Sequence, residues 1–168
     1  YTSQAYNKRM NRKMELLYRR AEWLTVMEAL LTGKLADAKQ EALTRGWKHI
    51  LTDQFHDIIP GSSIHEVYED SRKDYAYIEG IAREVEQEAY ENVFEQKDDT
   101  YTVINASGWT SDQIVVIPEN RDGIFRDQEG SELTAQKGQG GTYVEMKAVP
   151  AMGMKLITSE ERTETVPV

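Results

Sequence analysis

Apolar residues recur at intervals of three and four along the first 96 positions, and this spacing stops at the polar run 96–99. Between about residues 5 and 31 the stripe consists of Met10, Met14, Leu17, Ala21, Leu24 and Leu31. Such a stripe predicts a long amphipathic helix. Comparable stripes predict a second helix reaching Ile58 and a third over 63–96. With short connections between them, the sequence predicts a three-helix antiparallel bundle.

After residue 98 the pattern changes to short β-branched and apolar runs bounded by Asn, Ser, Gly and Pro. This pattern is typical of strands and turns. We expect strands over 101–104, 113–117, 142–149 and 154–158. The fold class predicted is therefore α+β, with a bundle domain at 1–98. Residues 99–168 are expected to form the N-terminal part of a β-sandwich-like domain.

The composition excludes several classes of protein. A formal net charge of -9 without a Lys/Arg cluster argues against nucleic-acid binding. No apolar run approaches the roughly 18 residues of a membrane span. The absence of cysteine excludes disulfides and thiolate metal sites, and a cytoplasmic location is expected. Because the chain starts at Tyr1 within a polar run, we expect a fragment of a larger protein; the sequence leaves homo-oligomer formation open.

The junction between the second and third predicted helices, residues 53–68, is where chemistry is expected. It places His56 and Asp57 just before Pro60 and Gly61, which should end the helix and reverse the chain. Ser63 and Glu66 have the spacing of a capping box, so Ser63 is the expected N-cap of the third helix. A negative charge at a helix C-terminus is unfavourable, so Asp57 needs a metal, an array of substrate hydroxyls, the next helix N-terminus or water.

A helical wheel of the second helix separates two faces. One face carries Leu43, Trp47, Ile50, Leu51 and Ile58, and the opposite face carries Ala42, Gly46, His49, Asp53 and His56. The second face is either a solvated surface or a docking surface with a functional histidine at its end. Both interpretations remain open at the level of sequence.

Other polar residues of this region allow alternative interpretations. His49, Asp53 and His56 follow an i, i+4, i+7 pattern that could gather metal ligands, although such sets arise easily by chance. Gln54 lies on the apolar side, so its amide either bridges to the backbone near Pro60 and Gly61 or stays at the edge in water. His65, at the start of the third helix, is expected at the surface or behind the ligands of a site rather than as a metal ligand.

The same junction resembles the central-domain signature of glycoside hydrolase family 38 α-mannosidases, particularly the bacterial members. The residues that carry the resemblance are Gln54-Phe55-His56-Asp57, Pro60-Gly61-Ser62-Ser63 and Glu66-Val67-Tyr68. Weaker similarity lies at Tyr1-Thr2-Ser3, Asn11-Arg12-Lys13, Glu15, Ala21-Glu22, Val103-Ile104-Asn105, Trp109 and Val149-Pro150-Ala151-Met152-Gly153. Asp53 departs from the asparagine that is frequent before the glutamine.

The resemblance implies part of a zinc-dependent retaining enzyme that hydrolyses α-linked mannose in mannosides or manno-oligosaccharides. By position, His56 would be the zinc ligand that the bundle contributes, and Asp57 a carboxylate that binds sugar hydroxyls. The nucleophile, the acid/base and the other ligands of the single zinc ion would come from an N-terminal catalytic domain. The isolated chain is then expected to be inactive. The alternative is a non-catalytic helical interaction module with a β appendage.

Overall fold

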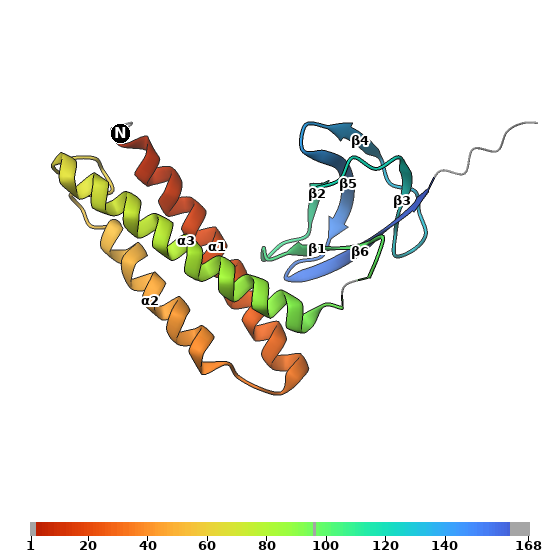
Figure 1. Ribbon diagram of the computed structural model, residues 1–168, viewed down its shortest axis with the longest axis horizontal. Coiled ribbons are helices and arrows are strands. Elements are labelled where there is room, and N and C mark those ends of the chain that lie inside the picture. Colours follow the sequence, from red (N-terminus) through yellow and green to blue (C-terminus); the bar gives the residue numbers. More distant parts are fainter. Residues whose placement is uncertain (1–2, 96, 162–168) are drawn as a thin grey trace, which may run out of the picture. The chain divides into compact units, whose positions relative to one another are not determined.

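The computed structural model describes residues 3–95 and 97–161, and these two stretches form two separate compact units. The first unit contains three helices and the second contains antiparallel strands (Figure 1). This confirms the α+β class predicted from the sequence. Within the described residues, no helix combines the length and the apolar character that crossing a bilayer requires.

The helices of the first unit are α1 (Ala5–Thr32), α2 (Asp37–Asp53) and α3 (His65–Val93), which lie side by side (Figure 1). Gly33 ends α1 in a left-handed conformation (φ 70°), and its N–H donates to the carbonyl of Ala29. The apolar stripes meet in one core. Its buried members are Met10, Met14, Leu17, Tyr18, Ala21, Leu43, Ile50, Tyr75, Ile78, Ala82 and Val85.

A buried ion pair joins all three helices near the α1–α2 connection. Lys39 of α2 donates to Glu28 of α1 at 2.7 Å, and Asn92 of α3 donates to the same carboxylate at 2.6 Å. Burial alone would raise the pKa of Glu28, but the hydrogen bonds from Lys39 and Asn92 lower it overall. The carboxylate is therefore held in its charged form inside the bundle.

The face of α2 that is buried differs from the face that the helical wheel predicts. Gly46 and Asp53, expected on the outer face, are buried, whereas Leu51, expected in the core, is 61% exposed. The cause is Tyr18 of α1, whose ring lies directly over Gly46. A docking surface built on the small residues Ala42 and Gly46 is therefore excluded, because this face of α2 packs against α1.

The two helix ends at the junction also differ from the prediction. α2 ends at Asp53, so His56 lies in a turn rather than on a helical face. α3 begins at His65, with Ile64 as the N-cap and no side-chain cap. Ser63 does not form the capping box, because its hydroxyl donates to the carbonyl of Asp57 at 2.6 Å. That bond takes the place of the helical bond the carbonyl would otherwise accept.

The second unit consists of two three-stranded antiparallel sheets within the described residues. One has the order β1 (Thr100–Asn105), β6 (Gly153–Glu161), β3 (Gly123–Asp127), and the other β2 (Ser111–Ile117), β5 (Gly141–Val149), β4 (Ala135–Gly138). The four expected strands are present, and β3 and β4 were missed. The core consists of Val103, Ile117, Phe125, Val144, Met146, Val149 and Ile157.

The contact between Gly46 and Tyr18 predicts opposite effects of alanine at two helical glycines. A Cβ on Gly46 would overlap the Tyr18 hydroxyl, whereas one on Gly80 meets nothing within 4 Å. Gly46→Ala should therefore destabilise the bundle by about 1 to 3 kcal/mol through overpacking. Gly80→Ala, the matched control, should stabilise it by up to about 1 kcal/mol. Urea unfolding followed by circular dichroism measures both; an unchanged midpoint for Gly46→Ala would contradict the packing.

Candidate functional site

The α2–α3 connection is a succession of turns rather than an open loop. The amides of Ile58 and Ile59 donate to the carbonyl of Phe55, and the amide of Gly61 donates to the carbonyl of Ile58. Gly61 adopts a φ of +97°, which favours glycine. Its Cα also lies against the chain start, because a Cβ there would come within 2.9 Å of the Ser3 carbonyl oxygen. Glycine is therefore required at this position for two reasons.

Side chains of α1 and α3 hold this connection in place. Lys8 of α1 donates to the carbonyl oxygens of Ser3 and Pro60, at 2.7 and 3.3 Å. The hydroxyl of Tyr68, a fully buried residue of α3, accepts a hydrogen bond of 2.9 Å from the amide of Ser63. The connection is thus tied to both neighbouring helices, which limits the positions its side chains can take.

Gln54 supplies the bridge that the sequence suggested, but to a different partner. Its Nε2 donates to Asn11 Oδ1 at 2.9 Å and to Glu15 Oε1 at 3.0 Å, both on α1. The expected bonds to the backbone near Pro60 and Gly61 are not the ones formed. The bridge fixes the residue that follows α2 to the surface of α1.

His56 and Asp57 project from this fixed connection. Their side chains are 76% and 58% exposed, and His56 Nε2 lies 3.5 Å from Asp57 Oδ2. The Phe55 ring lies 4.1 Å from the imidazole, measured between centroids. An accessible imidazole nitrogen beside an accessible carboxylate can coordinate a metal ion or accept hydrogen bonds from hydroxyl groups.

The donor types at this pair fit zinc, which binds histidine nitrogen and carboxylate oxygen. Their number does not complete a site, since zinc usually takes about four ligands. Among the residues that the structure describes, no group of three or more His, Asp or Glu side chains could hold a metal ion. His56 would therefore need ligands from another domain.

The other histidines are engaged elsewhere. His49 pairs with Asp74 at 3.2 Å, and His65 pairs with Glu69 at 3.3 Å. Asp53 is buried inside the bundle, so the trio His49, Asp53 and His56 is not brought together. This arrangement contradicts a self-contained metal site at these three positions.

A buried polar cluster around Asp53 was missed by sequence reasoning. It contains Asn7 of α1 and Ser71 and Tyr75 of α3, and Asn7 Nδ2 donates to Ser71 Oγ at 2.9 Å. The available signal was Ser71, a polar residue within the apolar stripe of the third helix. Its position indicated a buried polar partner on a neighbouring helix.

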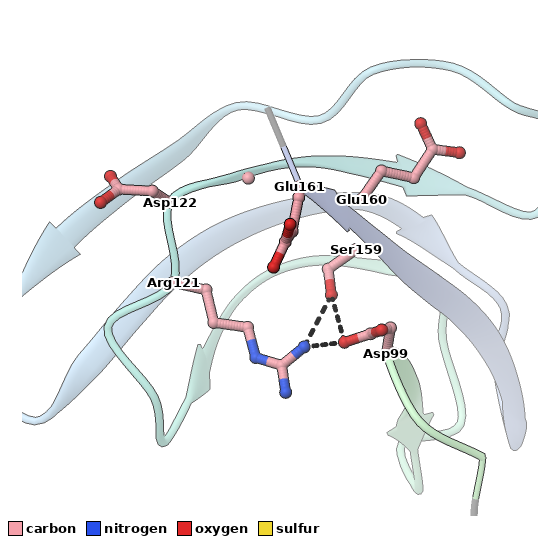
Figure 2. Close-up of a pocket in the computed structure, with 7 residues that line it drawn as sticks. Asp99, Arg121, Asp122, Ser159, Glu160 and Glu161 are labelled. Carbon is pink, nitrogen blue, oxygen red and sulfur yellow. Dashed lines mark hydrogen bonds and ion pairs between the residues drawn. The ribbon is translucent and has the colours of Figure 1, made fainter. Parts of the chain in front are cut away.

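The second unit has a pocket near the ends of β3 and β6 (Figure 2). Figure 2 shows Arg121 pointing toward Asp99 and Ser159, and both contact its guanidinium. Asp122 pairs with Lys137, and Glu160 pairs with Arg126. Because these charged groups pair with other residues of the unit, the pocket is best explained as a structural junction of strand ends.

Residues 1–93 match the family model described as the α-mannosidase middle domain. The chain is 43% identical to α-mannosidase G of Dictyostelium discoideum over 74 residues, and 34% identical to the α-mannosidase of Saccharomyces cerevisiae over 68 residues. These alignments cover 44% and 40% of this chain. They cover only 6% of the length of each curated relative.

Two solved structures from Enterococcus faecalis have a similar fold. One is a protein in glycosyl hydrolase family 38, with a TM-score of 0.70 at 17% identity over 99% of this chain. The other is an α-mannosidase, with a TM-score of 0.70 at 16% identity over 95% of this chain. This chain covers 26% and 24% of those chains.

The close approach at Gly61 predicts a larger cost for alanine there than at Gly33. Both glycines have positive φ, but a Cβ on Gly33 meets nothing within 4 Å. Gly33→Ala should cost about 1 to 2 kcal/mol from backbone strain alone, and Gly61→Ala should cost more because Ser3 must also move. Urea unfolding measures both costs. Hydrogen exchange should accelerate at residues 57–63 in Gly61→Ala only; equal costs and equal exchange would contradict the contact.

Proposed function

Because the chain belongs to the α-mannosidases of glycoside hydrolase family 38, with residues 1–93 as their middle domain, we propose that it forms part of an enzyme that hydrolyses terminal α-linked mannose. The observation that carries the proposal is the paired, exposed His56 and Asp57 on an anchored connection. Their substrate class is an α-mannoside or manno-oligosaccharide, and their partner is the catalytic domain of the same protein.

His56 is proposed as a ligand of one zinc ion. Its support is an imidazole that is 76% exposed and carried by a segment fixed by Lys8, Gln54 and Tyr68. A fixed ligand loses little conformational freedom when the metal binds, so the affinity of the site is higher. Bound zinc would polarise and orient substrate hydroxyls as a Lewis acid.

Asp57 is proposed to bind hydroxyl groups of the sugar. A carboxylate offers several acceptor positions and forms strong, charge-assisted hydrogen bonds with hydroxyl donors. Its side chain is 58% exposed, and its backbone carbonyl is held by Ser63. The backbone anchor would keep the carboxylate directed away from the bundle, beside His56.

The reaction proposed for the full-length protein is hydrolysis with retention of configuration. A carboxylate of the catalytic domain would attack the anomeric carbon while an acid protonates the departing glycosidic oxygen, and water would then release mannose from the glycosyl-enzyme. No described residue of this chain is assigned either role. The chain would supply binding and orientation.

Substitutions at the junction separate these roles in the full-length protein. His56→Ala should lose zinc, measured by atomic absorption, together with hydrolysis of an aryl α-mannoside. Asp57→Asn should retain zinc but raise KM by about tenfold or more, since a charge-assisted hydrogen bond contributes about 1.5 to 3 kcal/mol. His65→Ala is the matched control, because this exposed histidine pairs with Glu69 outside the site. An active His56→Ala enzyme with full zinc content would favour the interaction-module alternative.

The isolated 168-residue chain should neither hydrolyse an aryl α-mannoside nor bind zinc tightly. The physical reason is that His56 and Asp57 supply too few ligands for a complete site. Isothermal titration calorimetry with zinc chloride tests this directly. Tight stoichiometric binding that disappears in His56→Ala would instead indicate a self-contained site.

A further inference from the structure

Three polar atoms of the buried cluster around Asp53 lack a hydrogen-bond partner within the described part of the chain, and acceptors outnumber donors among them. Asn7 Oδ1, Asp53 Oδ2 and Tyr75 Oη are buried and have no hydrogen-bond partner among the described residues. An amide oxygen and an ionised carboxylate can only accept, so the tyrosine hydroxyl is the only donor of the three. A proton on Asp53 would add a second donor. The cluster therefore favours the neutral carboxylic acid.

The location of Asp53 connects this cluster to the proposed site. Asp53 is the last residue of α2, is only 1% exposed, and precedes His56 by three positions. Asn7 of α1 reaches the cluster through its bond to Ser71 of α3, so the cluster joins all three helices where the connection begins. An ionised carboxylate left partly unpaired there would weaken this end of the bundle.

We propose that Asp53 is a positioning residue that binds a proton as the bundle folds, so that the connection carrying His56 and Asp57 is held most firmly in mildly acidic solution. The stability change concerns this chain alone, while its consequence for zinc and sugar binding rests on the function proposed above. Asp53 makes no contact with the substrate in this proposal. It acts through the backbone of the connection.

The charged groups around Asp53 set the direction of its titration. Burial is the main cause that raises the pKa of Asp53, to about 6; the hydrogen bond with Ser71 lowers it, the charge of Asp74 raises it and that of His49 lowers it. The residue that α1 contributes to the cluster is Asn7, which carries no charge.

Two further groups of α1, Tyr6 and Glu15, act on the neighbouring Tyr75. The ordinary pKa of an aspartate side chain is 3.8. The folded chain therefore binds the proton more tightly than the unfolded chain.

The experiment compares unfolding of the 168-residue chain and of Asp53→Asn by urea between pH 4 and pH 8. Because the folded-state pKa is raised, the wild type should gain stability as the pH falls through 6 toward 3.8 and lose it as the pH rises. Relative to Asp53→Asn, its unfolding equilibrium constant should rise about 100-fold from pH 4 to pH 8, since each pKa unit is a factor of ten.

A second readout follows the connection itself. Hydrogen-exchange protection of the amides of Ile58, Ile59 and Gly61 should fall with rising pH in the wild type and stay level in Asp53→Asn. Asp70→Asn, which removes an exposed carboxylate of α3, should keep the wild-type slope. Parallel profiles for the wild type and Asp53→Asn would overturn the proposal and indicate an ionised Asp53 solvated by internal water.

A measurement on the unaltered chain avoids dependence on any variant. Carbon-13 NMR titration of the Asp53 carboxyl should give a midpoint near 6, and a midpoint at or below 4 would overturn the proposal. These tests use neither metal nor sugar. If His56→Ala kept its zinc, the role proposed for Asp53 would still stand. If Asp53 titrated with an ordinary pKa, the zinc proposal would still stand.

Discussion

The phenol of Tyr18 is the contact on which the arrangement of the bundle depends. This fully buried side chain of α1 covers Gly46 of α2, packs edge-on against Trp47, and donates to the carbonyl of Ile78 in α3 at 2.9 Å. Burial raises its pKa to about 12, which keeps the hydroxyl protonated as a donor. One side chain therefore sets the distance between α1 and α2 and the position of α3 along them.

The rotation of α2 follows from this contact. With Gly46 turned toward Tyr18, Asp53 points into the bundle and Leu51 points to solvent. Two buried polar groups then mark the ends of the bundle: the ion pair of Glu28 and Lys39 at one end, and the cluster of Asp53 at the other. In the first, the carboxylate of Glu28 is paired with the ammonium group of Lys39. In the second, one carboxylate oxygen of Asp53 has no partner among the described residues, which is why the stability of this end depends on pH.

The sequence was sufficient to predict the helices, because their apolar stripes are long and regular. It was insufficient for the face of α2, where a close contact with an aromatic ring of another helix outweighed the apolar preference of Leu51. The exposure of His56 was expected from a helical wheel, yet it arises because the residue lies in a turn beyond the helix. β4 was missed because its residues are all exposed and its pairing with β5 leaves no periodic pattern.

The ties that fix the connection join residues far apart in the sequence. Gln54 bonds to Asn11 across 43 positions, and Lys8 bonds to Pro60 across 52. Such contacts close long chain loops, so they can form only after α1 has docked onto the rest of the bundle. The geometry of the segment bearing His56 and Asp57 therefore depends on the docking of α1. Any partial opening that releases α1 breaks these bonds, making this segment a sensitive reporter of the integrity of the whole bundle.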